Sequence, residues 1–105
     1  MGRVEALMAQ QALYLDPDLT LSQVSRKLGV PVKQVSGAIN RVTGENVSRY
    51  INGARIAAAQ AALLAGENVT SAMLSSGFNT KSNFNREFLR VTGQSPSAWV
   101  AAQKR

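Results

Sequence analysis

The sequence predicts an all-α fold, and three observations carry that prediction. Apolar residues recur at helical spacing almost from end to end, and no stretch alternates apolar and polar residues as a strand would. Residues that start or stop helices interrupt this periodicity at short intervals. The tetrapeptide Arg-Val-Thr-Gly at 41–44 returns at 90–93, an offset of 49 residues (90 − 41 = 49). We therefore expect about seven helices, arranged as two helix-turn-helix units joined by a connecting helix.

The first unit is expected over residues 1–45 and begins with two helices. The first helix stops at the turn 16–18 and carries an apolar stripe made of Val4, Leu7, Met8 and Leu15. Thr20 caps the second helix, and Gln23 three residues later completes a capping box. Gly29 supplies the left-handed residue that ends this helix.

The third helix completes the first unit and is expected to have one apolar and one polar face. Pro31 suits its first position, because the first N–H groups of a helix lack a partner and proline has no N–H to leave unpaired. Val35, Ile39 and Val42 form its apolar stripe. Gly44 ends the helix.

A longer connecting helix is expected over residues 46–66. Asn46 can cap its start, and Gly66 closes it. The apolar segment 57–65 within it is far too short to cross a bilayer, so we expect no membrane contact by this chain.

The second unit, residues 67–105, repeats the pattern of the first. A short helix follows Asn68 and ends at Gly77. Asn79 or Thr80 then caps a helix that ends at Gly93 and is striped by Phe84, Phe88 and Val91. A last short helix opens at Ser95-Pro96 and contains Trp99.

The composition narrows the classes of function. The chain has 105 residues, enough for one domain or two very small ones, and twelve Lys and Arg against six Asp and Glu give a net charge of +6. Such an excess favours a polyanionic partner, although a surface tuned for solubility is the other interpretation. The absence of Cys and His removes the usual nucleophile, general base and metal ligands. We therefore expect no enzyme activity, no metal and no cofactor.

The second unit carries a set of residues at fixed spacings. They are Gly77, Phe78, Lys81, Ser82, Asn83, Phe84, Arg86, Phe88, Gly93, Ser95, Pro96 and Trp99. This pattern resembles the C-terminal signature of the AraC/XylS family of bacterial transcription regulators, which has a Gly-Phe turn, a Ser-x-Phe-x-Arg-x-Phe core, a glycine, then Ser/Thr-Pro and an aromatic residue. The first unit matches more loosely, through Leu21–Val24, Leu28–Val30 and Thr43-Gly44.

The resemblance implies a C-terminal DNA-binding domain that regulates transcription. Each unit would place its second helix in a major groove on one face of double-stranded DNA. The resemblance further implies a cytoplasmic, nucleoid-associated bacterial protein with RNA polymerase as a second partner. Many family members carry an N-terminal sensor or dimerisation domain. Because the chain begins directly on a predicted helix, we expect such a domain to precede it in the complete protein.

The second unit offers the best candidates for contact with bases. With the apolar stripe turned inward, the polar side chains of the helix after Thr80 point the other way. The guanidinium of Arg86 can pair with O6 and N7 of guanine, and Asn85 can pair with N6 and N7 of adenine. Lys81 and Ser82 lie in the first turn, where a recognition helix meets base edges. We expect Arg90, further round, to contact DNA phosphates.

The first unit departs from this pattern. Its expected base contacts are Lys33, Gln34 and Ser36. Gly37 stands where the second unit has Arg86 and brings no donor, so we infer that the first unit contacts fewer bases. Arg41 and Arg49 are expected on the phosphates.

Several alternatives stay open from the sequence alone. Arg55 on the connecting helix either contacts phosphates or is a buried structural residue. Glu87 is expected to lie off the DNA-contacting face. A competing hypothesis of another class is a protein-interaction module that keeps the helix-turn-helix form, with Gly37 marking a lost groove contact.

Overall fold

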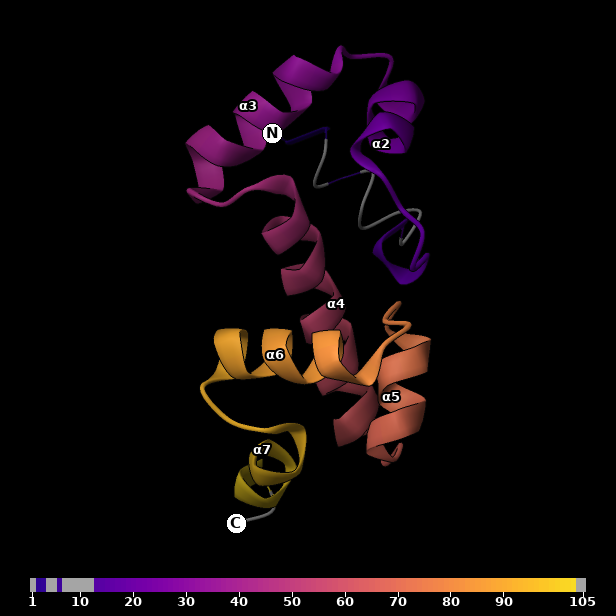
Figure 1. Cartoon of the computed structure of the whole chain (residues 1–105), viewed down its shortest axis with the longest axis vertical. Helices are drawn as coiled ribbons and strands as arrows, with labels where there is room; N and C mark the ends of the chain where they lie inside the picture. The colour runs from indigo at the N-terminus through magenta and orange to yellow at the C-terminus, as the bar shows by residue number, and fades with distance from the viewer. Residues whose placement is uncertain (1, 4–5, 7–12, 104–105) are drawn as a thin grey trace. The chain divides into compact units, whose positions relative to one another are not determined.

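The described part of the chain is entirely helical. The computed structural model describes residues 2–3, 6 and 13–103, and these form six α-helices and one 3-10 helix with no strand among them (Figure 1). The predicted all-α class is therefore confirmed, with six α-helices in place of about seven. The first expected helix lies mostly outside the described residues, and its last three positions, Leu13–Leu15, form the 3-10 helix η1.

The chain divides into two compact units, Met1–Ile51 and Asn52–Arg105. The first contains η1, α2 (Leu21–Leu28), α3 (Val32–Thr43) and the start of α4 (Val47–Leu64). The second contains the rest of α4, then α5 (Val69–Ser75), α6 (Lys81–Thr92) and α7 (Pro96–Gln103).

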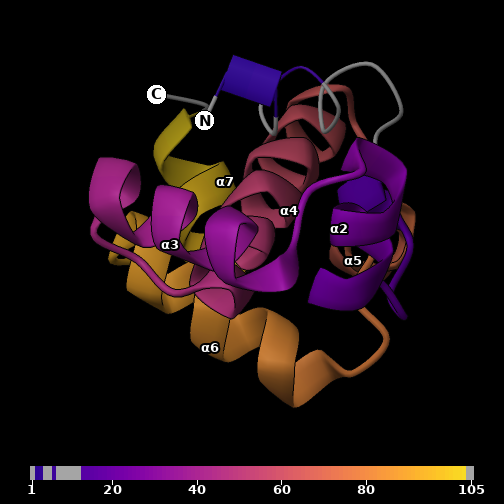
Figure 2. The same ribbon diagram turned by 90° about the horizontal axis from the view of Figure 1, so that it is seen from above.

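Helix α2 of the first unit begins and ends as its sequence predicts. Thr20 Oγ1 accepts a hydrogen bond from the N–H of Gln23 at 3.2 Å, and Gln23 Oε1 accepts one from the N–H of Thr20 at 3.0 Å. Gly29 ends the helix in the left-handed region with φ 68°. Helix α3 follows after a short turn and packs against α2 (Figure 2). Pro31 is the N-cap of α3 and not its first helical residue, one position earlier than expected.

The buried residues of the first unit are aliphatic. Among its described residues, Val24 of α2, Val35 and Ile39 of α3, and Ile51 of α4 are the buried hydrophobic ones. These residues hold the inner face of α3 against its neighbours.

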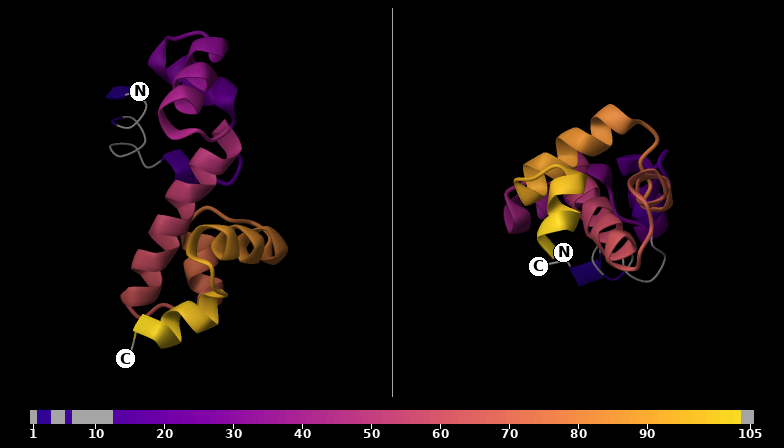
Figure 3. Two further views of the ribbon diagram at one scale, coloured as in Figure 1. Left: turned by 90° about the vertical axis from the view of Figure 1, so that its left-hand side faces the viewer. Right: turned by 90° about the horizontal axis from the view of Figure 1, so that it is seen from below.

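The second unit has an aromatic core. Phe78, Phe84 and Phe88 are buried together with Ile56 and small residues of α4 and α5. The rings meet edge to face, with centroids 5.2 Å apart for Phe78 and Phe84 and 5.6 Å apart for Phe84 and Phe88. Trp99 of α7 adds a third such contact, 5.9 Å from Phe88. Helices α5, α6 and α7 thus pack against the C-terminal part of α4 (Figure 3).

Three predicted caps set the helix starts in the second unit. Asn68 Oδ1 accepts from the N–H of Ser71 at 2.8 Å, and Ser95 Oγ accepts from the N–H of Ala98 at 3.2 Å. Of the two candidates before α6, Thr80 is the cap. The connecting helix α4 is capped in the same way by Asn46, whose Oδ1 accepts from the N–H of Arg49 at 2.8 Å.

The repeat in the sequence is also a repeat in structure. Helices α3 and α6 each contain 12 residues, and each ends at a left-handed glycine, Gly44 at φ 71° and Gly93 at φ 78°. The threonine hydroxyl before each glycine donates to the carbonyl four residues earlier, from Thr43 at 2.6 Å and from Thr92 at 2.8 Å. The Arg-Val-Thr-Gly tetrapeptide therefore encodes one helix ending that is used twice.

The turns that precede α3 and α6 repeat as well. The N–H of Val30 donates to the carbonyl of Ser25, and the N–H of Phe78 donates to that of Met73, both at 3.2 Å. Each bond spans five residues around a glycine of positive φ, as in a Schellman motif.

One part of the predicted stripes is wrong. Val42 and Val91 were expected in the core, but they are 61% and 43% exposed. Helical periodicity gives the direction of a side chain and not how far the neighbouring helices extend. In both helices the burial ends one turn before the helix does.

Candidate nucleic-acid interface

Helix α6 exposes the side chains that were expected to face DNA. Its N-terminal cap at Thr80 and its stripe Phe84 and Phe88 fix the rotation of the helix, because both rings are fully buried. The opposite face is exposed and carries Lys81, Ser82, Asn85, Arg86 and Leu89.

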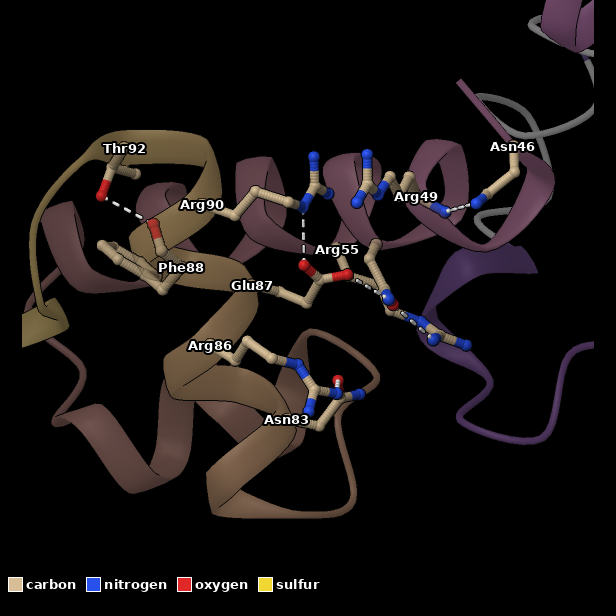
Figure 4. Close-up of polar contacts among 10 residues, drawn as sticks. Asn46, Arg49, Arg55, Asn83, Arg86, Glu87, Phe88, Arg90 and Thr92 are labelled. Carbon is tan, nitrogen blue, oxygen red and sulfur yellow. Dashed lines mark hydrogen bonds and ion pairs between the residues drawn. The ribbon is translucent and has the colours of Figure 1, made fainter.

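The guanidinium of Arg86 lies back along α6. One of its terminal nitrogens donates to Oδ1 of Asn83 at 2.8 Å (Figure 4). Side chains on a helix slope toward its N-terminus, so this contact three residues earlier is the expected direction. A guanidinium has five N–H donors, and this single bond leaves most of them for another partner.

A hollow of about 450 Å³ lies beside the exposed face of α6. Lys81, Asn85 and Leu89 line it from α6, together with residues at the N-terminal ends of α5 and α7. Lys81 and Asn85 thus share one concavity.

Glu87 is buried and organises a polar network inside the second unit. Its Oε2 accepts from Nε of Arg90 at 2.6 Å, and its Oε1 accepts from the amide of Asn52 at 2.8 Å (Figure 4). Asn52 Oδ1 in turn accepts from the guanidinium of Arg55 at 3.0 Å. The network ties α6 to the central part of α4.

The charges around Glu87 favour its ionised form. Burial raises the pKa of this carboxyl group, but the hydrogen bonds from Arg90 and Asn52 and the nearby charges of Arg90 and Arg86 outweigh burial. The pKa of Glu87 therefore lies below its ordinary value. A carboxylate held ionised in this way can keep Arg90 on the inner side of α6.

Of the two alternatives for Arg55, a phosphate contact or a buried structural residue, the structure supports the second. It is only 8% exposed, and its guanidinium lies 5.9 Å from the ring centroid of Phe78.

The base-contact candidates on α3 are less fully exposed than those on α6. Lys33 and Gln34 are exposed, whereas Ser36 is half-buried and its hydroxyl donates to the carbonyl of Lys33 at 3.3 Å. At Gly37, a Cβ atom would meet a terminal nitrogen of Arg41 at 3.2 Å. The guanidinium of Arg41 therefore lies over the glycine.

Two of these arrangements were not predicted from the sequence. Glu87 was placed off the contact face, but its burial and its partners were not expected. The only signal was the spacing of Glu87 and Arg90, three residues apart on one helix. The overlap of Arg41 with Gly37 had a similar signal, a spacing of four residues.

The part of the chain that the structure describes contains neither a metal-binding cluster nor a membrane-spanning helix. It contains no group of three His, Cys, Asp or Glu residues that could hold a metal ion. None of its helices combines the length and apolarity needed to span a membrane.

Comparison with known proteins identifies the fold. A family described as a helix-turn-helix domain, of the AraC type, matches residues 24–102, from within α2 to within α7. The chain belongs to the AraC-type helix-turn-helix family. This family consists of DNA-binding domains of transcription regulators and not of enzymes, so DNA binding and transcription regulation are the general function of the chain.

Solved structures agree with the AraC-type fold. The C-terminal domain of AraT, a response regulator from Geobacillus stearothermophilus, has a TM-score of 0.81 and 23% identity, with 98% of this chain and 83% of that chain covered. The C-terminal domain of the two-component response regulator yesN from Fusobacterium nucleatum has a TM-score of 0.79 and 20% identity, with 94% and 95% covered. A Listeria innocua protein of unknown function has a TM-score of 0.77 and 20% identity, with 93% of each chain covered.

At these identities, the structural matches show the fold alone. No curated protein matches the AraC-type chain in sequence.

Proposed function

We propose that the chain binds specific sequences of double-stranded DNA by placing α3 and α6 in successive major grooves. The observation that carries this proposal is the repeat itself, two 12-residue helices with the same turn before them and the same ending. A partner that presents the same groove every helical turn, about 34 Å apart, suits two such helices. The corresponding division is a first unit at 1–45, a connecting helix at 46–66 and a second unit at 67–105.

In the second unit, the proposed base contacts come from the exposed face of α6. Arg86 is the principal one, because its guanidinium fork matches the paired acceptors of guanine. Asn85, Lys81 and Ser82 lie on the same exposed face, nearer the start of the helix.

In the first unit, Lys33, Gln34 and Ser36 are the proposed base contacts at the start of α3. Arg49, exposed near the start of α4, is proposed to contact the phosphate backbone. Arg90 is proposed for the same role, since its side chain is 27% exposed. Arg41 is proposed to contact DNA as well.

The proposal extends to the setting in which the chain acts. We propose RNA polymerase as a second protein partner and the bacterial cytoplasm, at the nucleoid, as its location. We propose that the complete regulator carries an N-terminal sensor or dimerisation domain.

Selection of duplexes from a random library tests the proposal directly. The chain is expected to enrich one sequence, and log K for that duplex is expected to fall with log salt by about 0.9 for each phosphate neutralised. The competing hypothesis, a protein-interaction module, predicts no enriched sequence and no retarded band in a gel shift at any salt concentration.

The role of Arg86 is tested by two substitutions. Arg86→Ala is expected to weaken binding to the selected duplex by about 1–3 kcal/mol and to relax base preference at one position. Arg86→Lys keeps the charge but loses the planar fork, so we expect it to lose base preference while retaining affinity for scrambled DNA. Unchanged affinity of both variants for both duplexes would exclude this role.

A further inference from the structure

The same tetrapeptide places its arginine differently in the two units. Arg90 of the second unit is drawn to the buried carboxylate of Glu87, 2.6 Å away. The equivalent of Glu87 in the first unit is Ala38, 49 residues earlier, so this carboxylate is missing there. Among the residues that the structure describes, the exposed Arg41 has no ion pair and no hydrogen bond from its guanidinium.

Arg41 instead extends over the preceding turn of α3. A terminal nitrogen of its guanidinium lies 3.2 Å from where a Cβ atom of residue 37 would stand. Four residues of helix correspond to about 6 Å along the axis, so the charge is carried from the C-terminal end of α3 toward its middle.

The position that the guanidinium covers has a defined counterpart in the second unit. Gly37 corresponds to Arg86, and it follows Ser36 just as Arg86 follows Asn85 on the exposed face of α6. A bulky side chain at position 37 would extend into the space that Arg41 uses, since even its Cβ would lie 3.2 Å from the guanidinium. The glycine thus leaves open the path by which Arg41 reaches this face.

We infer that Arg41, lying across Gly37, supplies the base-contacting guanidinium of the first recognition helix. It would pair with adjacent acceptors on a base edge, as O6 and N7 of guanine provide in the major groove. The first unit then has one such guanidinium, as the second has in Arg86, and Gly37 is the residue that admits it. This inference rests on the proposed function of α3, and it replaces the sequence-based assignment of Arg41 to phosphate.

The test measures Arg41 and Gly37 together, with the duplex that the wild-type chain selects from a random library and a scrambled duplex of the same length. Arg41→Ala is expected to weaken binding to the selected duplex by roughly tenfold or more, with little change for the scrambled one. Arg41→Lys keeps the charge, and we expect it to lose most of the same preference because it lacks the fork.

Gly37→Leu is expected to act through Arg41. Among the described residues, a Cβ at this position meets only the Arg41 side chain within 4 Å outside the helix's own backbone, and leucine is a better helix former than glycine. The substitution is expected to lower specific affinity in the wild-type background and to cause no further loss in the Arg41→Ala background. Gly53→Ala, at a helical glycine with open space around it, is the matched control and is expected to leave binding unchanged.

Three outcomes would overturn the inference. Equal weakening of selected and scrambled duplexes by Arg41→Ala, with a salt slope reduced by about one, would make Arg41 a phosphate contact. Additive losses of affinity from Gly37→Leu and Arg41→Ala would show that the two residues affect binding independently. A gain in affinity from Gly37→Arg with Arg41 in place would make Gly37 a missing contact. If the wild-type chain enriches no duplex at all, the proposed function fails first, so the two failures are distinguishable.

Discussion

The two units build the same helix from different interiors. Helices α3 and α6 have equal length, the same preceding turn and the same threonine and glycine at the end. Underneath, the first has Val35 and Ile39 where the second has Phe84 and Phe88. The ends of a recognition helix are therefore encoded by short polar signals, while its buried face can be filled with aliphatic or aromatic side chains.

The two interiors also differ in how firmly they hold α3 and α6. The edge-to-face rings of the second unit are accompanied by the buried Glu87, whose partners bind α6 to α4. The first unit has Ala38 at that position, and among its described residues Arg41 has no counterpart of this network. We therefore expect α6 to be the more rigidly held helix, and the following predictions test that comparison in order of decreasing effect.

The largest expected effect comes from the core position that differs most. Phe84→Ala removes a fully buried ring and is expected to cost about 3–5 kcal/mol. Val35→Ala, at the equivalent position of the first unit, is expected to cost about 2 kcal/mol. Denaturant unfolding followed by Trp99 fluorescence, which reports on the second unit, and by circular dichroism, which reports on both, measures the two losses. Equal costs for both variants would remove the proposed contrast between the interiors.

The next effect concerns the carboxylate that only the second unit has. Glu87→Gln keeps the size of the side chain but removes the charge that holds Arg90, and we expect a loss of about 2 kcal/mol in the free energy of unfolding. Glu67→Gln is the control, because this exposed carboxylate accepts hydrogen bonds from the hydroxyls of Ser71 and Ser75. Its loss is expected to stay within about 0.5 kcal/mol. Similar losses for both variants would show that the buried position of Glu87 adds nothing to the free energy of unfolding.

The same carboxylate makes the stability of the second unit depend on pH. The pKa of Glu87 is lower in the folded chain than in the unfolded chain, because the contacts from Arg90 and Asn52 outweigh burial. Its contribution is therefore fully present above the unfolded value of about 4.3 and is lost as the pH falls through the lower folded value. Unfolding of wild type and Glu87→Gln between neutral and acidic pH is expected to show a difference that shrinks in that range. A difference that is constant down to the lowest pH would contradict the assignment to Glu87.

Local signals predicted most of the fold, because they act between neighbours in sequence. The caps at Thr20, Asn46 and Asn68 and the left-handed glycines involve residues only a few positions apart. The depth of burial at Val42 and Val91 was not predictable in this way, since it depends on how far other helices extend.

The same distinction between local and long-range signals applies to the candidate site. The outward face of α6 follows from helical geometry, so the exposure of Arg86 and Asn85 was predictable. The bond from Asn52 to Glu87 joins residues 35 positions apart, and no local pattern indicates it. The spacing of Arg41 and Gly37 alone does not predict that the Arg41 side chain lies over the glycine, because the direction of the side chain along the helix is also required. From the sequence, Gly37 therefore indicated only an absent contact.

The smallest expected effect tests whether caps matter equally in the two units. Thr20→Ala removes one half of the capping box of α2 and is expected to cost about 1 kcal/mol. Asn68→Ala removes the cap of α5 in the second unit and is expected to cost about the same. Thermal unfolding followed by circular dichroism compares them, with Trp99 fluorescence expected to follow only the second substitution. Because the first unit has the aliphatic interior, the same loss is expected to unfold a larger fraction of it at a given temperature. An equal response of both units would mean that aromatic packing gives the second unit no reserve of stability over the first.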